Sequence, residues 1–146
     1  MELKLLSRVD GDYESVFEAF DQQLFEYLLP PNAKLIRFDG SKVGDIVHLA
    51  FTAPIKTEWV SEITAVHHGE GERFFIDEGR KLPFGLKSWR HKHIVREEEG
   101  TTIIEDQIQY SSGLLLLDWL MYPVLFAAFY PRKRQYGTYF KAYQLS

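Results

Sequence analysis

The sequence contains no cysteine, no internal repeat and no low-complexity tract. Without cysteine, the chain can form neither a disulfide framework nor a thiolate zinc site. The formal net charge of −4 provides no overall positive field, so we expect no nucleic-acid partner. The first residues lack a basic segment followed by a long apolar run, so we expect no signal peptide and a cytoplasmic protein.

The sequence also contains no segment that would divide the chain into separate domains. It has 146 residues, of which 45% are hydrophobic and 26% are charged, and it contains no linker long enough to separate two parts. This length and composition are typical of one globular domain that buries a substantial core. We therefore expect residues 1–146 to form a single domain.

The most apolar part of the chain runs from Leu114 to Tyr130, and Asp118 is its only charged residue. A helix that is apolar on every side must be covered on both faces or lie in lipid. At 1.5 Å per residue it would be roughly 25 Å long, short of the ~30 Å core of a bilayer. Pro123 and Asp118 also argue against a membrane span. We expect no stable membrane insertion, and a helix with one face on a sheet and the other lining an apolar cavity.

Hydrophobic periodicity predicts one strand, two short helices, six further strands and the long helix. Helical spacing extends over residues 13–29, with Asp12 as the N-cap, a break near Asp21 and a stop at Pro30. Short glycine-containing turns favour an antiparallel meander, and the segment 79–87 is a candidate gate over whatever the sheet encloses. The expected strands are 2–8, 34–38, 44–53, 57–67, 73–78, 88–98 and 101–110.

The last two strands carry the polar residues that could form a site. Side chains alternate along a strand, so Trp89, His91 and His93 share the inner face of one strand. Asp106 and Tyr110 share the inner face of the next. A two-residue turn between the strands would place His93 opposite Asp106 and Trp89 opposite Tyr110, close enough for a contact between histidine and carboxylate.

Four of these residues, His91, His93, Asp106 and Tyr110, have several interpretations. As structural groups, His93 would bond to Asp106, and Tyr110 would bond to a backbone carbonyl. As pocket lining, the four would orient a small molecule. As catalysts, a histidine tuned by Asp106 would move protons while Tyr110 steadies an oxyanion. His91, His93 and Asp106 could also ligate a metal, but this combination arises easily by chance, and we expect neither a metal nor a cofactor.

Short motifs follow one another along the chain at residues 24–31, 44–46, 59–63, 75–77, 89–93, 106–110 and 129–132. Together they resemble the START-like superfamily, also called SRPBCC, and more narrowly its bacterial ligand-binding members related to polyketide cyclases. The resemblance implies an α+β helix-grip fold, in which a curved antiparallel seven-stranded sheet wraps around a long C-terminal helix. Two short helices would follow strand 1, and a hydrophobic cavity would lie between the sheet and the helix. Pro131 falls where the family commonly continues a helix, so the last helix should kink or restart there.

From the resemblance we expect the protein to bind a hydrophobic small molecule, such as a lipid, a sterol or a polyketide-like aromatic compound. One alternative is a cyclase- or dehydratase-like enzyme that uses the four polar residues. A second is a protein-interaction module like the superfamily's co-chaperones. The sequence does not indicate an oligomeric state. The residues expected to contact the ligand are Trp59, Ile63, Phe75, Trp89, His91, His93 and Tyr110 from the strands, with Trp119, Met121, Phe126 and Phe129 from the helix.

Overall fold

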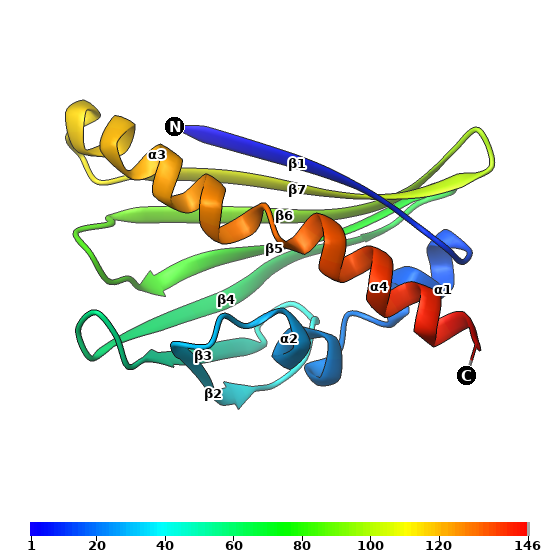
Figure 1. The fold of residues 1–146 in the computed structure, drawn as a ribbon, viewed down its shortest axis with the longest axis horizontal. Helices are drawn as coiled ribbons and strands as arrows, with labels where there is room; N and C mark the ends of the chain where they lie inside the picture. Colours follow the sequence, from blue (N-terminus) through cyan, green and yellow to red (C-terminus); the bar gives the residue numbers. More distant parts are fainter. Residues whose placement is uncertain (146) are drawn as a thin grey trace.

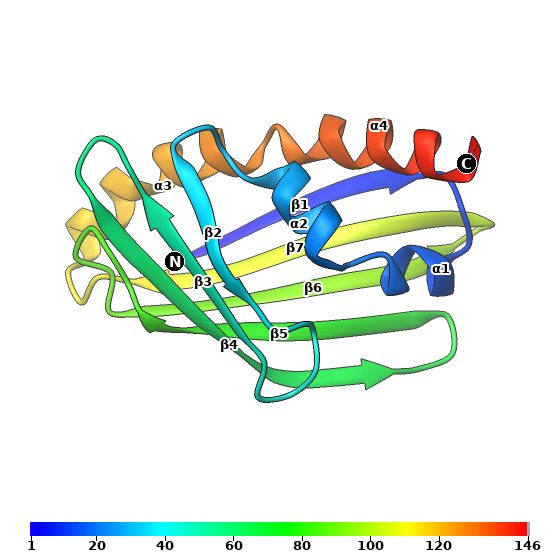
Figure 2. The ribbon, with the colours of Figure 1, turned by 90° about the horizontal axis from the view of Figure 1, so that it is seen from below.

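The computed structural model describes residues 1–145, with side chains placed through residue 142. Seven antiparallel strands form one sheet in the order β1-β7-β6-β5-β4-β3-β2. Helices α3 and α4 together form a rod that crosses the concave face of this sheet (Figures 1 and 2). The expected α+β helix-grip architecture is confirmed. The elements are β1 Glu2–Val9, α1 Tyr13–Glu18, α2 Gln22–Leu28, β2 Ala33–Phe38, β3 Ile46–Phe51, β4 Thr57–His68, β5 Glu72–Lys81, β6 Ser88–Glu98, β7 Thr101–Ser111, α3 Leu115–Phe129 and α4 Arg132–Leu145.

The curvature of the sheet has an identifiable origin in the pairing of β4 with β5. This pairing shifts register between Val60 and Ser61, where β5 has the extra residue, and between Ile63 and Ala65, where β4 has it. Extra residues of this kind bend a strand and increase its twist. β3 and β2 therefore turn up toward the helices instead of continuing the plane of β5 to β7 (Figure 2). Sheet and helices consequently enclose a space.

The helical segment after β1 breaks where the sequence predicts. Asp12 caps α1 by accepting a hydrogen bond from the Ser15 backbone N–H at 3.0 Å, and Asp21 caps α2 in the same way through Leu24 at 3.0 Å. Leu29, which precedes Pro30, has left the helix with φ −64° and ψ 138°. The helical segment thus ends before Pro30, and the chain continues as β2 at the edge of the sheet.

Two boundaries refine the expectations. The rod is two helices, because α3 ends at Phe129 and α4 begins directly after Pro131, so the predicted restart is confirmed. The predicted loop 79–87 is shorter than expected. Gly79 still pairs with Ser61 of β4, and β5 continues to Lys81.

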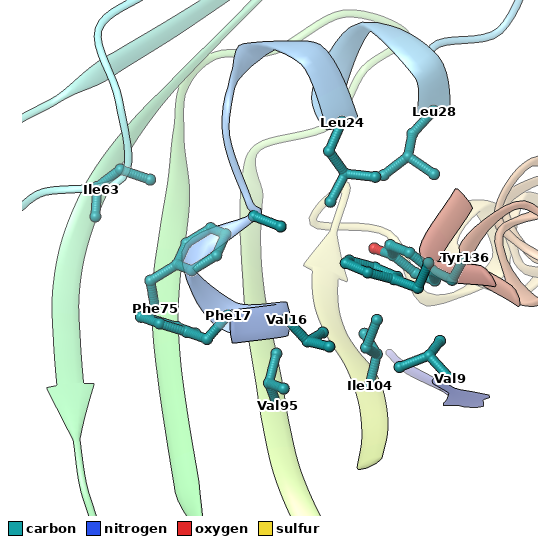
Figure 3. Close-up of a cluster of buried hydrophobic side chains, with 12 residues drawn as sticks. Val9, Val16, Phe17, Leu24, Leu28, Ile63, Phe75, Val95, Ile104 and Tyr136 are labelled. Atoms are coloured by element: carbon teal, nitrogen blue, oxygen red, sulfur yellow. The ribbon is translucent and has the colours of Figure 1, made fainter. Parts of the chain in front are cut away.

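Buried apolar side chains form two clusters. In the first, Val16 and Leu24 from the short helices and Tyr136 from α4 lie over Phe75 and Ile104 of the sheet (Figure 3). The second lies under α3. The buried members of the second cluster are Leu3, Leu86, Trp89, Ile108 and Tyr110.

The outer face of α3 differs from expectation. Leu115, Leu116 and Trp119 are 70%, 74% and 61% exposed, so the idea that this apolar stretch is covered on both faces is wrong. Its inner residues Met121 and Phe129 pack against the second cluster. Among the described residues, no helix is both long enough and apolar enough to span a membrane.

The start of α3 is fixed by Asp118. Its Oδ1 accepts hydrogen bonds from the backbone N–H and the hydroxyl of Ser112, both at 2.7 Å. Its backbone carbonyl accepts the hydroxyl hydrogen of Tyr110 at 2.8 Å. The bonds from Ser112 hold the pKa of Asp118 below its usual range. Together these contacts orient the helix relative to β7.

Removal of the Tyr110 hydroxyl tests this anchor. We expect Tyr110→Phe to lower the free energy of unfolding by about 1 kcal/mol, because a buried hydrogen bond is lost while the ring is kept. Denaturant unfolding measures the change. Tyr130→Phe, which removes a hydroxyl from a ring that is 53% exposed, is the matched control. Equal stability of the two variants would contradict the assignment.

Candidate functional site

A cavity of about 680 Å³ lies between the concave face of the sheet and helices α2 and α3. Its volume is in the range of about 300–1,000 Å³ found for small-molecule sites. Its walls are mainly aliphatic and aromatic, and they include Phe84 and Leu86 of the loop after β5. Of the residues expected to contact a ligand, those that line this cavity are Trp59, Ile63, Phe75, Trp89, His91, His93, Met121 and Phe129.

Three other expected ligand contacts do not line the cavity. Tyr110 lies beneath α3 with its hydroxyl bonded to Asp118, so it cannot steady an oxyanion there. Trp119 is on the outer face of α3, and Phe126 packs against Tyr130 with 5.4 Å between ring centroids. Because the helix is apolar all round, hydrophobic spacing could not distinguish its inner face. The α3 residues that line the cavity are Leu117, Leu120, Met121, Val124, Leu125, Ala128 and Phe129.

One wall of the cavity carries a polar cluster on three neighbouring strands and α4. His91 Nε2 lies 2.7 Å from Asp106 Oδ1, and His93 Nε2 lies 2.7 Å from Asp77 Oδ2. The two imidazole rings stack with 3.6 Å between centroids. Arg132 Nη1 lies 3.6 Å from Asp106 Oδ1. Asp106 is fully buried behind the histidines, whereas the other four residues line the cavity.

The pairing within this cluster corrects the sequence interpretation. The predicted register is confirmed, since His93 is opposite Asp106 and Trp89 is opposite Tyr110. The predicted bond between His93 and Asp106 is wrong, because His93 Nδ1 is 3.8 Å from Asp106 Oδ1 and the ring reaches β5 instead.

Asp77, the carboxylate that His93 contacts, was missed by the sequence analysis. It lies two residues after Phe75, which was assigned to the inner face. Strand alternation therefore places both side chains on that face. The alternation of β5 therefore predicts the position of Asp77, although the expected polar site draws only on β6 and β7.

Burial and hydrogen bonding set the protonation of the cluster. Burial lowers the pKa of His93 to about 4, with a further contribution from His91, and this outweighs the opposing effect of Asp77. Burial alone would raise the pKa of both carboxyl groups. The His93 bond nevertheless holds the pKa of Asp77 below its usual range, and the His91 bond does the same for Asp106. At neutral pH the cluster therefore has a neutral His93 beside two carboxylates.

No protein-family model and no curated protein matches the chain. Solved structures do match it, and they share its helix-grip fold, as the resemblance to START-like proteins implies. Protein Ms6760 from Mycobacterium smegmatis superposes with a TM-score of 0.67 at 19% identity, over 97% of this chain and 91% of that one. A point mutant of norcoclaurine synthase from Thalictrum flavum, in complex with a transition-state analogue, superposes with a TM-score of 0.72 at 13% identity, over 99% of this chain and 96% of that one. Major latex-like protein 151 from Panax ginseng superposes with a TM-score of 0.59 at 16% identity, over 93% of this chain and 97% of that one.

The shifted pKa of His93 predicts a pH-dependent stability. The ordinary histidine pKa is 6.5, and the folded value is about 4. Between these values the unfolded chain binds more protons than the folded protein, so the free energy of unfolding falls as the pH decreases through this window. We expect a loss of roughly 2 kcal/mol from His93, measured by urea unfolding between pH 7 and pH 4.5.

The variant His93→Gln should reduce this pH slope, because the side chain no longer titrates. His67→Gln, at an exposed position, should leave the slope unchanged. The lowered pKa values of Asp77 and Asp106 act in the same direction at more acidic pH, so part of the slope should persist in His93→Gln. A full slope in His93→Gln would disprove the assignment.

Proposed function

We propose that the protein binds a hydrophobic small molecule, such as a lipid, a sterol or a polyketide-like aromatic compound, in the cavity between the sheet and α3. The observation that carries this proposal is the combination of size and lining: about 680 Å³ of space with mainly apolar walls and one polar cluster. Such a lining favours a molecule with a large apolar body and few hydrogen-bonding groups. The complex of norcoclaurine synthase with a transition-state analogue supports a binding role for this fold.

The wall of the cavity is preorganised where the ligand would lie. Trp59 and Trp89 meet edge to face with 4.6 Å between ring centroids. The indole N–H of Trp59 donates to Ser61 Oγ at 3.0 Å. Trp89 also packs against Phe129 of α3, with 5.8 Å between centroids. Because these rings are already held in place, little conformational entropy would be lost when a ligand binds.

A pair of adjacent alanines on α3 provides a test. Both alanines are exposed, but Ala128 lines the mouth of the cavity and Ala127 does not. We expect fatty acids, sterols or aromatic polyketide-like compounds to raise the melting temperature of the protein. A ligand present at 100 times its Kd stabilises the folded state by about 2.7 kcal/mol. Ala128→Trp should abolish this shift by filling the cavity, and Ala127→Trp should preserve it.

Two results would contradict the binding proposal. One is that no apolar compound of the panel shifts the melting of the unmodified protein. The other is that the Ala128→Trp and Ala127→Trp variants respond equally, which would place the binding elsewhere on the surface. The melting temperatures of both variants without ligand show whether either substitution damages the fold itself.

A second candidate function is proton transfer on the bound molecule, as in a cyclase or dehydratase. It is favoured by one observation, the 2.7 Å contact between His93 and Asp77 in the cavity wall. In D2O the protein should then accelerate exchange of the α-hydrogens of a bound aromatic ketone, followed by NMR. His93→Gln should lose the exchange and retain binding, and exchange at the wild-type rate in this variant would exclude the role. The second alternative, a role as a protein-interaction module, stays a prediction.

A further inference from the structure

We propose that Asp77, His91 and His93 form a binding site for a divalent transition-metal cation of the zinc type, with one open coordination position that faces the cavity. Each residue offers one ligand atom, and these atoms lie within 4.8 Å of one another. Two imidazoles and one carboxylate are a donor set that binds zinc and similar cations. All three side chains line the cavity, so the cation would be reachable from it.

The distances fit one ion. Zinc bonds to nitrogen and oxygen are about 2.0–2.2 Å, which at tetrahedral angles separates two ligand atoms by roughly 3.3–3.5 Å. His93 Nε2 is 2.7 Å and His91 Nδ1 is 3.9 Å from Asp77 Oδ2, so the two values lie on either side of this separation. The two imidazole rings stack with 3.6 Å between centroids, so one ring must also rotate for both lone pairs to point at the same ion.

His91 is already oriented as a metal ligand. Its Nε2 lies 2.7 Å from Asp106 Oδ1, and the ionised carboxylate can only accept, so Nε2 carries the N–H of this contact. A metal-bound His91 would use the lone pair of Nδ1, which lies 3.9 Å from Asp77 Oδ2, also an acceptor. Two facing acceptors repel each other, and a proton or a metal cation between them removes this repulsion. A carboxylate behind a histidine is the arrangement that orients metal-ligating imidazoles in proteins.

His93 provides an independent observation. Its side chain is buried, and in the described part of the chain its Nδ1 has no hydrogen-bond partner. If Nε2 gives its lone pair to a cation, the proton of the neutral ring moves to Nδ1, which faces Asp106 Oδ1 at 3.8 Å. Asp106 would then support both imidazoles. The unpartnered nitrogen would gain a hydrogen bond if the ring moved closer to Asp106 as it turned toward the cation.

The charge of the cluster favours a cation. With neutral imidazoles, the two carboxylates and Arg132 leave a net charge of −1. Arg132 lies against Asp106 at 3.6 Å and over the Phe129 ring at 4.6 Å, so its closest carboxylate contact is with the buried Asp106. The carboxylate of Asp77 remains available to the ion. The open position, normally held by water, could accept an oxygen of a molecule in the cavity.

The test is a metal titration of the full chain, without an affinity tag and after treatment with EDTA. Calorimetry with ZnCl2 should show one zinc ion per chain. Addition of Co2+ should produce the visible absorption of a tetrahedral complex, which a purely structural cluster would not produce. Asp77→Asn, His91→Gln and His93→Gln should each weaken zinc binding at least about tenfold, and Asp106→Asn should weaken it about 10–100-fold.

His67→Gln, which removes an exposed histidine beside a turn, is the control and should bind zinc as the unmodified protein does. The proposal is overturned if the unmodified protein gives neither zinc binding nor a Co2+ spectrum, a result that does not depend on the folding of any variant. It is also overturned if the His91→Gln/His93→Gln double variant binds zinc normally. The cavity proposal is tested by melting shifts with apolar compounds and this one by zinc and Co2+ binding to the unmodified protein, so the two failures are distinguishable.

Discussion

The polar cluster depends on one constraint: the carboxylate of Asp106 is completely buried, and a buried charge must be paired. Its partners come from two different parts of the chain. His91 contacts it from the neighbouring strand β6, and Arg132 contacts it from the first turn of α4. The pairing of this charge therefore connects strands β6 and β7 to the point where the helical rod restarts after Pro131.

This connection, together with the anchor at Asp118, explains why α3 can close a cavity. The helix is held at its beginning by Ser112 and Tyr110 on the β7 side, and just beyond its end by the contact between Arg132 and Asp106. Between these points it packs on the second cluster with one part of its surface and faces the cavity with another. An apolar helix held at both ends does not have to fill the space beneath it.

Strand periodicity predicted the architecture well because each strand has only two faces. The alternation from Trp89 to His93 and the turn after β6 were sufficient to determine the register opposite Asp106. Two features of the site could not be predicted from strand periodicity. Which carboxylate each imidazole contacts depends on side-chain rotation and on a third strand, which contributes Asp77. The inner face of α3 could not be assigned, because a helix that is apolar all round carries no periodic signal.

The cluster is chemically versatile because Asp77, unlike Asp106, faces open space. Asp106 is committed to His91 and Arg132, whereas Asp77 has contacts to the two imidazoles and a side exposed to the cavity. A polar group of a ligand, a proton in transfer and a metal ion would all meet the same carboxylate oxygen, 2.7 Å from His93 Nε2. They differ in what they require of that nitrogen. A hydrogen bond to Asp77 needs its N–H, whereas a cation needs its lone pair, so the tautomer of His93 decides between these roles.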